Sequence, residues 1–328
     1  MRIRLLVVLQ LAALMMLSRA SYGETKGTFA VPQSTLLFSY TSLRLTTSKQ
    51  EFIVPNPPGL MGEGFSPLPL PALAPSGEIV AGALALPIDA ERRRFHLVIG
   101  VYSLLNNSWR TYGDFCSSDH GSVAFSPEGT KVAFISNSKE GSSNCDSSPK
   151  LLRILDLVTG NLTTVPYPAE YLMENARLSW SPDGKYLAAQ SGHWASPTQH
   201  IVVIEVASGI GKTIAVGTDP SWSPKGDWIA YTEAGSMQKC MLIHPDGTGV
   251  KMVRDLSKEY RRGYWEFYHG AVWSPDGAKL LLNESELEVP GSLVVTMLDL
   301  TTGKVTTESK HGMVVFGWAN NPGEYLGW

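Results

Sequence analysis

The chain has 328 residues, of which 43% are hydrophobic and 17% are charged, and its formal net charge is −3. This composition excludes wholesale disorder, because the chain has enough apolar residues to bury a core of useful size. The mildly acidic balance argues against nucleic acid or an anionic membrane as the main partner.

The first 23 residues have the three parts of a secretory signal peptide. Arg2 and Arg4 give a basic start, residues 5–17 are almost wholly apolar, and small residues follow, so we expect cleavage after Ala20 or Gly23. An uncleaved anchor is the alternative, but the apolar run is short of the roughly 20 residues that span a bilayer. The sequence therefore predicts a periplasmic or secreted protein with no membrane span after signal removal. Its mature net charge is −6, from 24 basic and 30 acidic residues.

One pattern recurs along the rest of the chain: an apolar stretch that ends in an aromatic residue, then Ser-Pro-acid-Gly, then a second apolar stretch. The four clear copies and the two degenerate ones that flank them lie at Phe125–Gly129, Trp180–Gly184, Trp222–Gly226 and Trp273–Gly277, and at Leu73–Gly77 and Trp318–Gly323. The prolines of these copies are 42 to 55 residues apart. That period suits units of four short strands.

The repeated motif predicts a tight hairpin. Proline presets φ at the first corner, the acid can accept a bond from the backbone beyond it, and glycine supplies a positive φ at the exit. A second hairpin follows in each unit, as at Asp156–Gly160, at Asp299–Gly303 and at Ser208-Gly209. The strands are apolar at successive positions, which is typical of sheets covered on both faces.

These repeats resemble the WD-like repeats of TolB-type propellers, and the resemblance covers about residues 70 to 328. It implies an all-β fold, a six-bladed β-propeller. TolB carries a separate α/β domain before its propeller, and only about ten residues separate the predicted signal from the first predicted strand here. The resemblance is therefore to the propeller domain alone.

We expect one propeller domain over residues 24–328, with a last blade that is a composite of N- and C-terminal strands. Residues 34–54 are expected to supply an outer hairpin that completes the inner strands of residues 313–328. Such closure removes sheet edges that invite aggregation. The predicted blades are residues 70–113, 121–166, 176–216, 219–253, 269–309, and 313–328 with 34–54.

The two faces of such a ring differ in sequence. Short, regular turns occupy one face, and long, irregular connections occupy the other, where recognition usually lies. The most distinctive connection carries Arg261, Arg262, Tyr264 and Trp265, which are residue types of interface centres. The alternative is that Trp265 and Phe267 fold under as a plug on the channel mouth.

Polar residues recur just before the innermost strand of each unit and are expected to converge at one mouth of the central channel. They include His120, Asp219, His269 and His311. Three histidines with nearby carboxylates could bind a metal or a small ligand. Because His-Gly recurs at this place in three units, a repeated local hydrogen bond is the simpler interpretation, and we assign no metal and no cofactor.

The chain has three cysteines. Cys116 and Cys145 are expected on the same face and are a candidate disulfide in an oxidising compartment. Cys240 lies in an apolar strand and is expected to be a buried thiol.

No Gly-x-Ser-x-Gly, His-Glu-x-x-His or Cys-x-x-Cys string is present. The sequence therefore favours an exported, monomeric binding scaffold whose loop-rich face takes a protein or glycan ligand. The alternative is a propeller enzyme, a hydrolase or a lyase, with a site at the channel mouth among His120, Asp219, His269 and His311.

Overall fold

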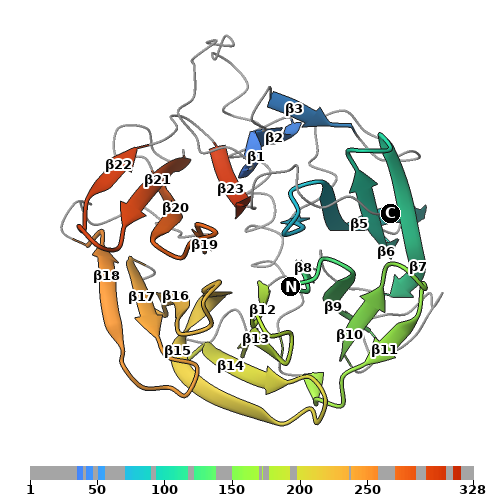
Figure 1. The fold of residues 1–328 in the computed structure, drawn as a ribbon. Helices are drawn as coiled ribbons and strands as arrows, with labels where there is room; N and C mark the ends of the chain where they lie inside the picture. Colours follow the sequence, from blue (N-terminus) through green and yellow to red (C-terminus); the bar gives the residue numbers. More distant parts are fainter. Residues whose placement is uncertain are drawn as a thin grey trace.

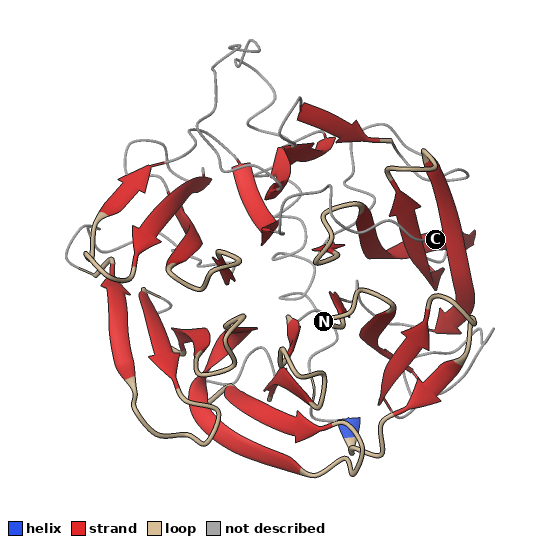
Figure 2. Ribbon diagram, viewed as in Figure 1, coloured by secondary structure: helices blue, strands red, loops and turns tan. Residues whose placement is uncertain are grey.

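The computed structural model is built almost wholly of β-strands arranged as a ring around an axis (Figures 1 and 2). It describes residues 35–39, 42–46, 51–55, 71–89, 94–116, 122–137, 150–169, 172, 177–192, 198–235, 238–257, 270–285, 293–307 and 313–318. Within these ranges, no helix has the length and apolar character that a membrane span requires. The prediction of an all-β propeller is confirmed.

Strand pairing divides the described strands into units of four antiparallel strands, which we number as blades from the N-terminal repeat onward. Blade 1 contains β4 (Ala72–Leu73), β5 (Ile79–Asp89), β6 (Arg94–Ser103) and β7 (Ser108–Cys116). Blade 2 contains β8 (Val123–Phe125), β9 (Lys131–Asn137), β10 (Lys150–Asp156) and β11 (Leu162–Thr164). Blade 5 contains β19 (Ala271–Trp273), β20 (Lys279–Ser285), β21 (Leu293–Asp299) and β22 (Val305–Thr307).

Blades 3 and 4 share one long strand, β15 (Gly211–Trp222). Residues 211–216 pair with β14, and residues 217–222 pair with β16, with a bulge between Thr218 and Ser221. The connection between these two blades is therefore a continuous strand and not a loop. Blade 3 contains β12 (Leu178–Trp180), β13 (Tyr186–Ser191) and β14 (His200–Glu205), and blade 4 contains β16 (Ile229–Glu233), β17 (Lys239–Ile243) and β18 (Lys251–Asp255).

Blade 6 combines the two ends of the chain, as predicted, but the division of its strands differs from the prediction. Its order is β23 (Met313–Trp318), β1 (Thr35–Ser39), β2 (Ser42–Thr46) and β3 (Glu51–Val54). The N-terminal segment thus supplies three strands and not two. The apolar run that was expected to form one strand turns between Ser39 and Ser42, which pair with each other. β1 then takes the place beside β23 that a second C-terminal strand was expected to fill.

The ring closes between blades 5, 6 and 1. β23 lies against the innermost strands on both sides, β19 and β4. At the periphery, the Trp109 indole N–H donates to the Pro55 carbonyl over 3.0 Å, which ties blade 1 to the segment that leaves β3. The outer strand of blade 1 is thus fastened to the N-terminal part of the composite blade.

The repeated turns have the predicted mechanics. In blade 3, the Ser181 hydroxyl donates to Asp183 over 2.6 Å and accepts the Tyr186 N–H over 2.9 Å. Gly184 follows with a φ of 69°. In blade 4, where Lys225 replaces the acid, the Ser223 hydroxyl donates to Asp227 instead. The same local bonds therefore form from two different sequences.

The apolar core lies between blades and not within them. Buried clusters join blades 1 and 2, blades 2 and 3, blades 3 and 4, and blades 4 and 5. The aromatic residue before Ser-Pro adds a polar bond across two of these interfaces. The Trp180 indole N–H donates to the Ala124 carbonyl of blade 2 over 3.1 Å, and that of Trp273 donates to the Ser221 carbonyl of blade 4 over 2.9 Å.

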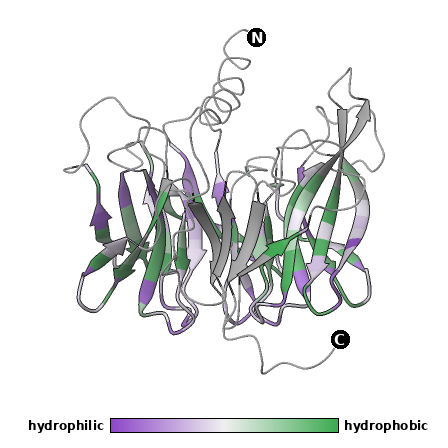
Figure 3. Ribbon diagram, turned by 90° about the horizontal axis from the view of Figure 1, so that it is seen from above, coloured by the Kyte–Doolittle hydropathy of each residue, from purple (hydrophilic) through white to green (hydrophobic). Residues whose placement is uncertain are grey.

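The short hairpin turns gather on one face of the ring, which we call the turn face (Figure 3). Each innermost strand begins at the opposite face, the loop face, and runs to a Ser-Pro turn. Along the ring, the turn glycines lie close to the turn prolines of the preceding blade. A Cβ built on Gly129 or Gly226 would lie 3.6 Å from Pro75 or 3.1 Å from Pro182. The turns of neighbouring blades therefore pack against one another on this face.

Candidate functional site

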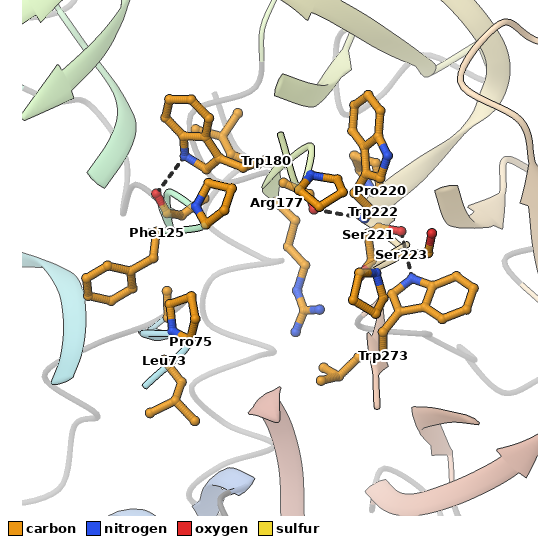
Figure 4. A pocket seen from close by; sticks show the side chains of 18 of the residues that line it. Leu73, Pro75, Phe125, Arg177, Trp180, Pro220, Ser221, Trp222, Ser223 and Trp273 are labelled. Atoms are coloured by element: carbon orange, nitrogen blue, oxygen red, sulfur yellow. Dashed lines mark hydrogen bonds between the residues drawn. The ribbon is translucent and has the colours of Figure 1, made fainter. Parts of the chain in front are cut away.

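The central channel contains a cavity of about 370 Å³ between the innermost strands of blades 1 to 5. Its walls are mainly apolar. They include a proline from the turn of each of these blades, and those prolines mark the end nearer the turn face. Figure 4 shows the side chains that line it, with Arg177 extending into the space between Pro75 and Trp273. A cavity of this size can hold a small organic ligand.

One layer of residues frames the loop end of this cavity. In blades 2 to 5, the residue five positions before the turn proline stands immediately before the innermost strand or, in blade 4, within the part of β15 that forms this strand. In blades 2 to 5 this residue is Ser122, Arg177, Asp219 and Gly270. Arg177 and Asp219 are thus equivalent residues of opposite charge in neighbouring blades.

Arg177 is the only charged residue among the described residues that line the cavity. Its Nη1 donates to the Ala271 carbonyl of blade 5 over 3.2 Å, so the side chain reaches across the inner strand of blade 4. Burial lowers the pKa of the guanidinium below its ordinary value, and the charge of Asp219 acts in the opposite direction. Arg177 still carries its charge at neutral pH, because arginine does not deprotonate in proteins. A cation is therefore held in a largely apolar chamber.

Asp219 is held in an unusual backbone conformation. Its φ is 52°, a left-handed value that non-glycine residues seldom adopt, and it immediately precedes Pro220, which further restricts it. Its N–H donates to Gln190 Oε1 over 3.3 Å, and the Gln190 amide donates in turn to Gln199 over 3.0 Å. Backbone strain that the surroundings maintain in this way is concentrated at functional sites.

Gly270 provides the space that Arg177 occupies. It adopts a φ of 74°, and a Cβ at this position would lie 3.0 Å from Arg177 Nη1. The sequence interpretation of the recurring His-Gly is a repeated hydrogen bond, and it stays a prediction. In blade 5, the glycine of this pair lets the guanidinium of blade 3 approach the backbone.

Several polar groups of the channel wall are already engaged within the protein. The Ser179 hydroxyl accepts the Trp222 N–H over 2.8 Å. The Ser223 and Ser274 hydroxyls donate to Asp227 and Asp276 over 2.8 and 2.6 Å. The charge that the described wall offers a ligand is that of Arg177.

Of the binding residues predicted from the sequence, only Asp219 lies within the described ranges. The structure places it in blade 4, where its charge acts on the guanidinium of Arg177. The others lie outside the described residues: His120, Arg261, Arg262, Tyr264, Trp265, His269 and His311. Among the described residues, no group of three or more His, Cys, Asp or Glu is arranged to hold a metal ion.

The cysteine predictions have different outcomes. Cys240 is buried and free, as predicted. Burial raises the pKa of its thiol to about 12, and the charge of Glu284 adds to the effect. Cys145 lies outside the described residues, as does the side chain of Cys116, so a disulfide between them stays a prediction.

Comparison with solved structures identifies the architecture. TolB from Acinetobacter baumannii superposes with a TM-score of 0.60 at 16% identity, over 86% of this chain and 66% of that one. This chain thus spans just under two thirds of that TolB. The putative TolB from Agrobacterium tumefaciens gives 0.55 at 17% identity, over 87% and 92% of the two chains. The fold is a TolB-like β-propeller.

Other solved structures share the propeller architecture at similarly low sequence identity. They include a chain of a nidogen/laminin complex (TM-score 0.57, 12% identity, 86% of this chain and 96% of that one). Another is an oligogalacturonate lyase from Vibrio parahaemolyticus (0.50, 13%, 83% and 72%). No family model and no curated protein matches the chain. Binding proteins and enzymes thus share this fold, and only the site can distinguish the two functions.

Sequence reasoning missed Arg177. It singled out histidines and acids before the inner strands, but not an arginine in the same register. Aligning the repeats on their turn prolines 182 and 224 would have placed Arg177 and Asp219 at equivalent positions. An unlike charge pair on adjacent blades of a closed ring is therefore visible in the sequence, once the register of the repeat is used.

Proposed function

We propose that this chain is an exported TolB-like propeller that acts as a binding scaffold, and that it takes its ligand at the loop face above the central channel. The observation that carries the proposal is the framed cavity: Arg177 extends into an apolar chamber, Asp219 is held in a strained conformation beside it, and Gly270 makes room for the guanidinium. The turns of the turn face, by contrast, are short and regular and pack against one another. The predicted signal peptide supports export to the periplasm or the medium.

The proposal extends the site outward to the long connections of the loop face. Tyr264, Trp265, Arg261 and Arg262 belong to one of these connections by sequence. Aromatic and arginine side chains supply rigid contact area with polar ends, as binding surfaces require. The ligand is expected to be a protein or a glycan, and the propeller is expected to act as a monomer.

Capture of ligand from the native cell envelope and from the medium tests this proposal. We compare the mature chain with a Tyr264→Ala/Trp265→Ala variant. The matched control is a Val158→Ser/Ile210→Ser variant, which removes two apolar side chains that are 64% and 70% exposed at turns of the turn face. We expect the loop-face variant to lose the captured ligand with an unchanged melting temperature. Equal capture by all three proteins, or loss only in the turn-face variant, would contradict the proposal.

A second candidate function is a hydrolase or lyase with its site at the channel mouth. The strained conformation of Asp219 is the observation that supports it, because strain of this kind is found at active sites. Metal analysis of the purified protein separates the two candidates. A stoichiometric divalent ion that is lost in a His269→Ala/His311→Ala variant would favour the enzyme.

A further inference from the structure

We propose that the channel of this protein is a receptor for a small apolar carboxylic acid, whose carboxylate pairs with Arg177 and whose apolar body occupies the chamber below it. The inference deepens the proposed function and rests on it in one respect, since the ligand enters from the loop face. It names the chemistry of the group that the channel takes.

The charge of Arg177 selects an anion. A guanidinium is a planar fork with five N–H donors and matches the two oxygens of a carboxylate. The bond to Ala271 O orients the fork. A ligand carboxylate would share the guanidinium with Asp219, whose charge already acts on it.

The position of the guanidinium strengthens such a bond. Charge-assisted hydrogen bonds gain strength where water is excluded and the local dielectric is low. Arg177 is surrounded by the innermost strands of five blades, and desolvation already acts on it. Gly270 fixes its approach to blade 5. The cation is thus oriented before a ligand arrives, which reduces the entropy lost on binding.

The remainder of the chamber selects an apolar body. Leu73, Phe125, Pro220 and the turn prolines line it. The hydroxyls of Ser179, Ser223 and Ser274 are engaged in bonds within the protein. A sugar brings several hydroxyls that each need a partner when buried, so the wall suits an aliphatic group better than a glycan. A volume of about 370 Å³ lies within the range of small-ligand pockets.

A carboxylate on an apolar group has two natural sources, a free small molecule and the C-terminal end of a peptide. The test therefore uses the intact mature chain and titrates N-acetyl-leucine and, separately, the peptide N-acetyl-Gly-Gly-Pro-Leu, each against its C-terminal amide. Binding is followed by NMR chemical-shift changes of the tryptophan indole N–H groups, because Trp180 and Trp273 lie in the channel wall. D-Galacturonate serves as the polar acid.

We expect each acid to bind roughly tenfold to a hundredfold more tightly than its amide, the range of a charge-assisted hydrogen bond. Arg177→Met should abolish the difference, and Arg177→Lys should retain part of it. Asp219→Asn should tighten binding of the acid, because it removes a competing carboxylate. Arg110→Met, on the exposed outer strand of blade 1, is the matched control and should change nothing.

Equal affinity for acid and amide would overturn the proposal, as would an acid preference that survives in Arg177→Met. Tighter binding of galacturonate than of N-acetyl-leucine would overturn the apolar part of it. If Arg177→Met does not fold, the other two variants still test the proposal, because Arg177→Lys should weaken binding of the acid and Asp219→Asn should tighten it. Equal capture by the parent chain and the Tyr264→Ala/Trp265→Ala variant, with retained acid binding, would refute the proposed scaffold function alone, so the two failures are distinguishable.

Discussion

Three glycines offer a controlled test of how closely the blades pack at their periphery. Gly160, Gly209 and Gly303 each close the turn between the third and fourth strands of a blade, and their φ angles are 74°, 70° and 72°. A Cβ on Gly160 or Gly303 would meet nothing within 4 Å. A Cβ on Gly209 would lie 2.2 Å from the carbonyl oxygen of Pro166, which belongs to the backbone of the segment that leaves blade 2. The three positions share their conformation and differ in their neighbours.

Substitution by alanine separates backbone strain from crowding. A left-handed conformation costs a residue with a Cβ about 1–2 kcal/mol, so Gly160→Ala and Gly303→Ala should each lower the free energy of unfolding by that amount. Gly209→Ala bears the same strain, and the neighbouring backbone must also move. Overpacking of this kind adds about 1–3 kcal/mol. We therefore expect a loss of about 2–5 kcal/mol for Gly209→Ala.

The assay is urea unfolding followed by tryptophan fluorescence, with linear extrapolation to zero denaturant. All three variants should keep the m-value of the parent chain if only native-state stability changes. If the three alanine variants lose the same stability, the contact between the blade 3 turn and the segment leaving blade 2 does not exist as described, and the account of peripheral packing fails.

Three further predictions concern charge and burial. The pKa values of Asp183 and Asp276 are lowered, chiefly by the Ser181 and Ser274 hydroxyls, so their stabilising effect is present above the ordinary aspartate value of 3.8 and is lost as pH falls through the lower folded value. The melting temperature should stay level from about pH 7 to 5 and fall below about pH 4. In an Asp183→Asn/Asp276→Asn variant the fall should be less steep. An identical fall in the variant and the parent chain would disprove this linkage. Glu284→Gln breaks a buried ion pair, with Arg254 Nε 3.0 Å from Glu284 Oε1 and the Glu284 side chain 4% exposed, and should lower the free energy of unfolding by about 3 kcal/mol. The control Glu233→Gln breaks a pair whose side chains are 31% and 35% exposed and should lower it by less than about 1 kcal/mol; equal losses would contradict the difference in burial. Cys240, whose pKa burial raises to about 12, should resist iodoacetamide at pH 8 until the protein unfolds, and rapid labelling of this residue in the native state would show that the interface of blades 4 and 5 is open.

The sequence predicts the repeating part of this fold well, because the turn chemistry is local. Ser181, Asp183 and Gly184 interact within one hairpin, so a single copy of the motif suffices to predict the bonds. The replacement of the acid by Lys225 is compensated two residues later by Asp227, which is still within the reach of a local argument.

The parts that could not be predicted depend on contacts between distant segments. The turn between Ser39 and Ser42 lies inside an apolar run with no proline or glycine, and it is defined by the pairing of β1 with β23. The continuity of β15 likewise depends on neighbours on both sides. Arg177 was missed because a charge before an apolar strand is ordinary in sequence and becomes distinctive only when the ring brings Asp219 and Gly270 beside it.

Closure of the ring by the two ends of the chain is the central structural claim. In the composite blade, Phe38 of β1 is paired with Val314 of β23. Paired residues of an antiparallel ladder have Cα atoms about 4.5–5.5 Å apart, within the range of a disulfide. The most direct measurement is therefore disulfide trapping in a Phe38→Cys/Val314→Cys variant of a chain whose native cysteines are replaced by alanine. We expect rapid, near-complete cross-linking into a species with increased mobility on a non-reducing gel, whereas Phe38→Cys/Val305→Cys, which joins β1 to the outer strand of blade 5, should not cross-link. Failure of the first pair to cross-link in the folded protein, or equal cross-linking of both pairs, would contradict a ring closed by its own ends.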